Sequence, residues 1–279
     1  MDGLVSVEWL AANLDRKDLV VLDCSVDASQ DAAGAMQYQS GRALFCQSRI
    51  PGAAHADLVA QLSDPESGAL FALPEPEAFR RTVQKLGVRD GATIVLYDRS
   101  FTAWAARVWW MLRWIGFDSA VILDGGLTAW LNVGHDTSSG PADEAETGAL
   151  TMQLRPGVIA RQADVLGEIG NTDTCLIDTL SASNFQGETD DYARKGHITG
   201  ATNAFSLDMF ETDGRFKPAA VLAEMHGGTK SSRHITYCGA GILASATAFV
   251  LVQLGYKDVS MYAASLQEWA ADPANPMET

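Results

Sequence analysis

One stretch decides the fold: Tyr237-Cys238-Gly239-Ala240-Gly241-Ile242-Leu243-Ala244-Ser245. An apolar run, 234–237, comes directly before the cysteine, and residues 243–254 are almost wholly apolar until Gly255 follows. This order predicts a strand, a tight loop and a buried helix that ends at the glycine. Cys238 is therefore expected where the strand ends and the loop begins.

The predicted loop surrounds the cysteine with the groups that a nucleophile needs. Gly239 and Gly241 let the backbone fold closely around the sulfur of Cys238. The unpaired amides of the loop and of the first helical turn, with the helix dipole, stabilise an anion there. The expected chemistry is a thiolate nucleophile, and a buried structural cysteine is the alternative that the loop alone leaves open. The residues expected to contact a substrate are Gly239, Ala240, Gly241, Ile242, Leu243 and Ala244.

Two other anion-binding loops fit this stretch poorly. A cysteine phosphatase has an arginine six residues after its cysteine, because the guanidinium holds the phosphate oxygens. Here the sixth residue after Cys238 is Ala244. The stretch also imitates the glycine pattern of dinucleotide-binding proteins. That reading needs an acidic residue at the end of the next strand, whereas Asp258 precedes its strand.

Length and composition describe a globular protein of two domains. The chain has 279 residues, of which 47% are hydrophobic and 20% charged. Its formal net charge is −15 without a Lys/Arg cluster, which argues against nucleic acid or an anionic membrane surface as a partner. No signal-peptide pattern, membrane-length apolar run or metal-ligand spacing is visible. The scattered cysteines favour the reducing cytoplasm, and they are Cys24, Cys46, Cys175 and Cys238.

Segments of the first half of the chain recur in the same order in the second half. The pairs are 20–23 and 175–178, 49–55 and 197–203, 94–98 and 234–238, 115–117 and 254–256, and 126–130 and 265–269. Such an ordered repeat indicates two copies of one domain. Because strands alternate with helices in each copy, we predict an α/β unit with a mainly parallel sheet.

The repeat also predicts the domain boundaries and the active copy. Residues 136–150 contain almost no large apolar side chain and are predicted to be a linker between domains 1–135 and 151–279. The nucleophile position carries Asp98 in the first copy and Cys238 in the second. A carboxylate is no sulfur nucleophile, so only the second copy is expected to be catalytic.

These motifs resemble the tandem-domain rhodanese family of thiosulfate and 3-mercaptopyruvate sulfurtransferases. The resemblance runs from Leu4 to Trp269 and rests on Ile50–Ala53, Gly196–Ala201, Asp124–Gly126, Asp98 and the Cys238 loop. It implies that the cysteine takes a sulfane sulfur from a small donor as a persulfide. The sulfur then passes to cyanide, a thiol or a protein acceptor, and neither a metal nor an organic cofactor is implied.

Departures from the family pattern concern the sulfur donor. The loop after Cys238 looks more like that of mercaptopyruvate enzymes, since it lacks the Arg and Lys that are typical of thiosulfate enzymes. Asn184 stands where the family often has an arginine that binds the donor carboxylate, and Arg194 is the nearest candidate to replace it. A non-catalytic sulfur carrier or binding protein is the alternative function.

Overall fold

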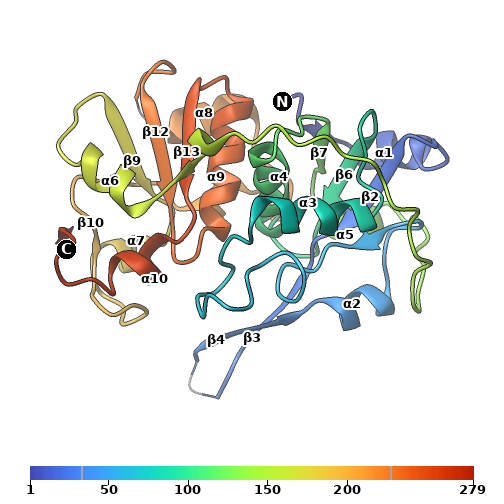
Figure 1. Ribbon diagram of the computed structural model, residues 1–279, viewed down its shortest axis with the longest axis horizontal. Helices are drawn as coiled ribbons and strands as arrows, with labels where there is room; N and C mark the ends of the chain where they lie inside the picture. Colours follow the sequence, from blue (N-terminus) through green and yellow to red (C-terminus); the bar gives the residue numbers. More distant parts are fainter. Residues whose placement is uncertain (33, 227) are drawn as a thin grey trace. The chain divides into compact units, whose positions relative to one another are not determined.

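The chain forms two α/β units. The computed structural model describes residues 1–32, 34–226 and 228–279. The N-terminal unit comprises Asp2–Leu154 and Thr212–Arg215, and the C-terminal unit comprises Met1, Arg155–Glu211 and Phe216–Thr279. Helices cover both faces of a parallel sheet in each unit (Figure 1), which confirms the predicted fold class.

The N-terminal unit is built on a parallel sheet with the strand order β1-β7-β6-β2-β5. Its strands are β1 (Leu4–Val5), β2 (Leu19–Asp23), β5 (Ala54–His55), β6 (Thr93–Tyr97) and β7 (Ala120–Leu123). Its helices are α1 (Val7–Asn13), α2 (Arg42–Gln47), α3 (Pro76–Lys85), α4 (Ala103–Trp114) and α5 (Gly126–Asn132). A separate antiparallel ribbon of β3 (Val26–Gln30) and β4 (Met36–Ser40) extends from this unit (Figure 1).

Alternation along β6 divides the core of the N-terminal unit between the two faces of the sheet. Val95 and Tyr97 lie in a cluster with the apolar residues of α1, α2 and α5. The helix α4 packs on β6 and β7, and its tryptophans Trp104, Trp109, Trp110 and Trp114 are buried. These tryptophans therefore belong to the core of the unit.

The C-terminal unit repeats this plan with the strand order β11-β9-β12-β13-β8. The strands are β8 (Ile159–Ala160), β9 (Thr174–Asp178), β11 (Thr202–Asn203), β12 (Arg233–Tyr237) and β13 (Asp258–Tyr262), with an antiparallel pair β10 (His197–Ile198) and β14 (Met277–Glu278). The helices are α6 (Gln162–Glu168), α7 (Ala182–Phe185), α8 (Ala219–Met225), α9 (Ile242–Gln253) and α10 (Ser265–Trp269), with 3-10 turns η1 (Pro156–Val158) and η2 (Ser206–Met209).

The residues of β12 also alternate between two faces. Ile235 and Tyr237 pack in a cluster with residues of α6 and α10, whereas the Thr236 hydroxyl donates to the Ala244 carbonyl of α9 at 3.0 Å. At the carboxyl end of the sheet, Tyr237 of β12 lies opposite Asp178 of β9. The loop that follows β12 therefore lies where ligands bind in parallel α/β sheets.

The segment 136–150, predicted to be a linker, contains neither a helix nor a named strand. Hydrogen bonds nevertheless hold it to the N-terminal unit. The amide of Gly140 donates to the Cys46 carbonyl at 2.7 Å, and Arg49 Nη1 donates to the Gly140 carbonyl at 2.6 Å. The segment therefore lies on the N-terminal unit, and the division between the units falls after Leu154.

Candidate active site

Cys238 lies in the turn between β12 and α9, as the sequence predicts. It is 2% exposed, and the helix begins four residues later at Ile242. Gly241 precedes the helix with φ of 79°, in the left-handed region that glycine adopts without a steric penalty. This glycine turns the chain so that the amino end of the helix faces back toward the cysteine.

The sulfur and the backbone of Cys238 are held by different partners. The Gly241 amide donates to Cys238 Sγ at 3.1 Å, which is the contact expected to stabilise a thiolate. The Cys238 amide donates to Ser265 Oγ at 3.1 Å, and this hydroxyl donates to the Tyr262 carbonyl at 2.7 Å. The Leu266 amide donates to the Cys238 carbonyl at 3.0 Å. These bonds fix the position of the cysteine backbone.

The same turn in the N-terminal unit carries Asp98. One oxygen of this carboxylate accepts from the amides of Ser100 at 2.9 Å and Thr102 at 3.1 Å. The other oxygen accepts from the Ala105 amide at 3.1 Å. Thr102 precedes its helix with φ of 61°, as Gly241 does in the other unit. The turn is thus an anion-binding site in its own right, although burial raises the pKa of the Asp98 carboxyl.

Beneath the cysteine turn, Asp178 and Tyr237 form a buried pair. Asp178 Oδ1 accepts from the Leu180 amide at 2.8 Å, and the Tyr237 hydroxyl accepts from the Ile198 amide at 3.1 Å. The nearby Tyr237 hydroxyl favours the charged form of the Asp178 carboxyl and so lowers its pKa. Burial nevertheless raises the pKa of Asp178 to about 6, because the charged form loses its hydration. The Asp178 carboxylate therefore holds the turn that follows β9.

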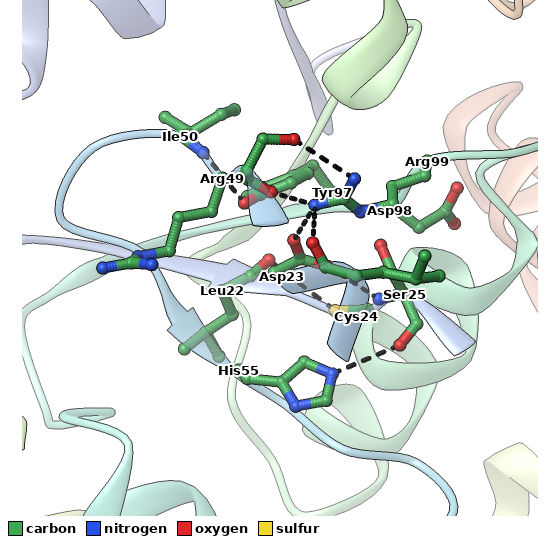
Figure 2. A network of polar contacts seen from close by, with 12 residues as sticks. Leu22, Asp23, Cys24, Ser25, Arg49, Ile50, His55, Tyr97, Asp98 and Arg99 are labelled. Carbon is green, nitrogen blue, oxygen red and sulfur yellow. Dashed lines mark hydrogen bonds and ion pairs between the residues drawn. The ribbon is translucent and has the colours of Figure 1, made fainter. Parts of the chain in front are cut away.

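Figure 2 shows the equivalent pair in the N-terminal unit, where an arginine joins it. Asp23 Oδ1 accepts from the Ser25 amide at 2.9 Å, and the Tyr97 hydroxyl accepts from the Ile50 amide at 3.1 Å. Arg99, which follows Asp98, lies 3.9 Å from Asp23 Oδ2. Its guanidinium also donates to the carbonyls of Leu44 and Ser48.

Gly239 takes the place of Arg99 in the C-terminal unit. A Cβ atom at this position would lie 2.0 Å from the hydroxyl oxygen of Tyr192. Its φ lies outside the left-handed region, so the close approach of Tyr192 is what requires glycine here. Tyr192 belongs to the loop 186–195, and this loop therefore lies directly against the cysteine turn.

Arg194, the predicted ligand of a donor carboxylate, binds the backbone near the C-terminus. Its guanidinium donates to the carbonyls of Trp269, Ala270, Asp272 and Asn275, at 3.1, 3.1, 2.7 and 2.8 Å. These bonds favour a structural role, because they use every nitrogen of the side chain. Donor binding by Arg194 stays a prediction.

Asn184, on α7, holds the middle of the loop 186–195. Its Nδ2 donates to Thr189 Oγ1 at 2.9 Å and to Asp191 Oδ2 at 3.0 Å. The residue is only 6% exposed. Where the family often has an arginine, this chain therefore has a buried amide that holds a carboxylate.

The remaining predicted contact residues follow the cysteine in the turn and the first turn of α9. Gly241, Ile242 and Ala244 are buried, whereas Gly239, Ala240 and Leu243 are partly exposed. Sequence reasoning missed Ser265 and Tyr192. Ser265 occupies the repeat position of Gly126, so a serine at a glycine position was the available signal, and it adopts φ of 58°. Tyr192 carries no such signal.

Within the described residues, no group of His, Cys, Asp and Glu side chains is arranged to hold a metal ion. Every helix in the described part of the chain is too short or too polar to span a bilayer. Cys24, Cys46, Cys175 and Cys238 are free thiols.

Comparisons with known proteins agree with this geometry. The model of the rhodanese-like domain matches residues 6–133 and 162–272. The chain belongs to the family of tandem rhodanese-like sulfurtransferases. It is 33% identical to the "Probable 3-mercaptopyruvate sulfurtransferase" of Pseudomonas aeruginosa, over 99% of this chain and 98% of the relative. It is 30% identical to the 3-mercaptopyruvate sulfurtransferase of Escherichia coli K12, over 98% and 97% of the two chains.

A solved structure of this family has the same fold. The crystal structure of SseA from Escherichia coli, described as a 3-mercaptopyruvate sulfurtransferase fold, superposes with a TM-score of 0.82 at 28% identity. The match covers 94% of this rhodanese-family chain and 98% of SseA. The prediction of two rhodanese-like domains is thereby confirmed.

Proposed function

We propose that Cys238 carries a sulfane sulfur as a persulfide between a small donor and a thiophilic acceptor, with 3-mercaptopyruvate favoured over thiosulfate as donor. The observation that carries this proposal is the bond from the Gly241 amide to Cys238 Sγ at 3.1 Å, at the amino end of α9. An amide at this position stabilises the thiolate that must attack the donor.

The first half-reaction transfers one sulfur to the cysteine. The Cys238 thiolate attacks the thiol sulfur of 3-mercaptopyruvate, so that a sulfur–sulfur bond forms and the carbon–sulfur bond of the donor breaks. The electron pair of the broken bond passes to the pyruvate carbon, which takes up a proton. Pyruvate leaves, and no external oxidant or reductant is needed.

The Asp98 turn supports a role for the backbone in holding the persulfide. The carboxylate oxygens of Asp98 lie one bond farther from the backbone than the Sγ of a cysteine does. Asp98 Oδ2 accepts from the Ala105 amide at 3.1 Å. When the two turns are aligned at Thr102 and Gly241, Ala105 corresponds to Ala244. We therefore expect the amides of Gly241 and Ala244 to contact the inner and outer sulfur atoms of the Cys238 persulfide.

Charge supports the preference between the donors. The loop residues 239–245 include no lysine or arginine, so a doubly charged thiosulfate gains little there against the loss of its hydration. The singly charged carboxylate of 3-mercaptopyruvate has a smaller hydration penalty. The two relatives compared above are also named for 3-mercaptopyruvate.

The test combines mass measurement with turnover. After incubation with 3-mercaptopyruvate, the intact protein should gain one sulfur atom at Cys238, and Cys238→Ser should abolish both the adduct and sulfur transfer to cyanide. Thiosulfate at a matched concentration should turn over more slowly. Sulfur on Cys24, Cys46 or Cys175 would contradict the proposal, and a single loading without turnover would favour a sulfur carrier.

The role of Arg194 is tested by Arg194→Ala. If its guanidinium binds the donor carboxylate, the kcat/KM for 3-mercaptopyruvate should fall roughly ten- to a hundredfold, mostly through KM. If it only holds the chain near the C-terminus, the melting temperature should fall while KM stays unchanged. A cytoplasmic location and a protein acceptor stay predictions from the sequence.

A further inference from the structure

Directly before the loop 186–195, helix α7 carries a buried polar side chain that is only partly satisfied. Asn184 directs its Nδ2 to Thr189 Oγ1 and Asp191 Oδ2, at 2.9 and 3.0 Å. Only an amide NH2 can face a carboxylate in this way, so the orientation of the side chain is fixed. Its Oδ1 is buried and accepts no hydrogen bond from the described residues. A buried acceptor without a partner is rare in native proteins and calls for an explanation.

This acceptor lies on α7, directly before the loop that touches the cysteine turn. The residue after Asp191 is Tyr192. Its hydroxyl oxygen lies 2.0 Å from the position that a Cβ of Gly239 would take. On the other side, the chain that leads from β9 to Asn184 is attached to the cysteine strand, because Thr179 donates to the Tyr237 carbonyl at 2.9 Å. The loop that contains Asp191 is therefore held against the turn that contains Cys238 through Tyr192.

The charges that remain available in this loop are negative. Arg194 is occupied by backbone carbonyls, and Lys195 Nζ lies 2.8 Å from Asp190 Oδ1. Asp191 and Glu188 are exposed to solvent, and the partner of Asp191 is the neutral amide of Asn184. The loop thus offers hydrogen-bond acceptors and negative charge to a molecule that approaches Cys238.

We infer that the Asn184–Asp191 pair selects a sulfur acceptor that carries a positive charge, namely a thiol with an ammonium or similar cationic group. This inference rests on the proposed persulfide function. The proposed donor is an anion, so the substrate that these groups recognise is the other one, which enters after pyruvate has left. An arginine at position 184 would select the opposite charge.

The step in question is the second half-reaction. The thiolate of the acceptor attacks the outer sulfur of the Cys238 persulfide, and a new sulfur–sulfur bond forms on the acceptor. The bond between Cys238 Sγ and the outer sulfur breaks, and its electron pair restores the cysteine thiolate. The acceptor leaves as a hydropersulfide, and no co-reactant is consumed.

The experiment isolates this half-reaction. The wild-type enzyme is loaded with 3-mercaptopyruvate, freed of donor and mixed with cysteamine, 2-mercaptoethanol or 3-mercaptopropionate, which differ mainly in charge. The loss of the persulfide is followed by mass spectrometry. Each thiol is compared between wild type and Asp191→Asn, so that differences in thiol reactivity cancel.

We expect Asp191→Asn to slow the reaction with cysteamine roughly two- to fivefold at low ionic strength, because an exposed charge pair contributes modestly. The reaction with 2-mercaptoethanol should stay unchanged, and that with 3-mercaptopropionate should become faster. Added salt should remove the difference for cysteamine in the wild type.

Asp190→Asn is the matched control, since it removes the same charge one position away but leaves the bond from Asn184 intact. It should change the cysteamine rate less than Asp191→Asn does. Equal effects of the two variants, or an equal effect of Asp191→Asn on all three thiols, would overturn the inference while leaving the persulfide intact. Failure of the wild type to form a persulfide would instead overturn the proposed function, and the inference with it.

Discussion

The turns at Asp98 and Cys238 have the same plan, with one more residue in the first, and differ in the side chain at the end of the strand. Each follows the central strand of a parallel sheet, and each precedes a helix whose first cap residue has a positive φ. The amide of Leu127 or Leu266 donates to the carbonyl of the nucleophile position, at 2.9 and 3.0 Å. In both turns, backbone amides donate to the side chain at the end of the strand, and we propose that the cysteine, unlike the aspartate, reacts there.

The residue after the nucleophile position makes the second difference. Arg99 closes the first turn onto Asp23 and the carbonyls near Ser48. Gly239 leaves the second turn without a side chain, and Tyr192 lies against it. Among the described residues, no arginine or lysine pairs with Asp178. Its pKa is raised to about 6, first of all by burial.

The largest effect is expected from making the second turn like the first. Cys238→Asp should abolish persulfide formation and turnover, because a carboxylate cannot accept a sulfane sulfur. The protein should stay folded, since the equivalent turn already accommodates Asp98. Sulfur transfer to cyanide and the circular dichroism spectrum provide the measurement. Residual turnover above that of Cys238→Ser would show that another residue accepts sulfur.

Removing the carboxylate of the first turn should lower the free energy of unfolding and leave turnover largely unchanged. Asp98→Ala leaves the amides of Ser100, Thr102 and Ala105 without their acceptor in a buried site. We expect a loss of about 3 kcal/mol in the free energy of unfolding, measured with urea. Asp98→Asn, which keeps one acceptor oxygen, is the control and should cost less. A complete loss of turnover in folded Asp98→Ala would mean that the first unit takes part in the chemistry.

Asp178 should make stability depend on pH. Its pKa is about 6 in the folded protein against the ordinary 3.8, so the folded state binds a proton that the unfolded state has released between these values. The stabilising contribution is present below pH 4 and is lost as the pH rises through 6. It amounts to roughly 3 kcal/mol.

Urea unfolding between pH 4 and pH 7 tests this sign. The free energy of unfolding of the wild type, relative to Asp178→Asn, should decrease as the pH rises. An unchanged difference across this range would show that Asp178 titrates alike in both states.

The smallest effect is expected at Gly239. Gly239→Ala puts a methyl group against the hydroxyl of Tyr192 and should cost about 1–3 kcal/mol by overpacking. Adding Tyr192→Phe to this variant should restore part of the stability, because it removes the nearest atom. Thermal unfolding of the two variants checks this. If Tyr192→Phe gives no recovery, the contact with the hydroxyl is not what requires glycine.

Much of the fold follows from the sequence because its signals are local. The apolar run 234–237 predicted the strand β12, and the helix predicted from 243 to 254 begins and ends within one residue of α9. The repeat predicted the common architecture of the two units and the equivalence of Asp98 and Cys238. Burial on both faces of a parallel sheet produces such apolar runs directly.

Tertiary structure alone decided the contacts around the cysteine. Ser265 binds the Cys238 amide across 27 positions of sequence, and Arg194 reaches carbonyls more than 70 positions away. The ribbon of β3 and β4 and the pairing of β10 with β14 also had no clear local signal. A side chain that hydrogen-bonds a distant backbone group leaves no periodic pattern in the sequence. The sequence therefore determined the turn and the cysteine that we propose as its nucleophile, whereas packing decided which side chains hold that turn and which charges surround it.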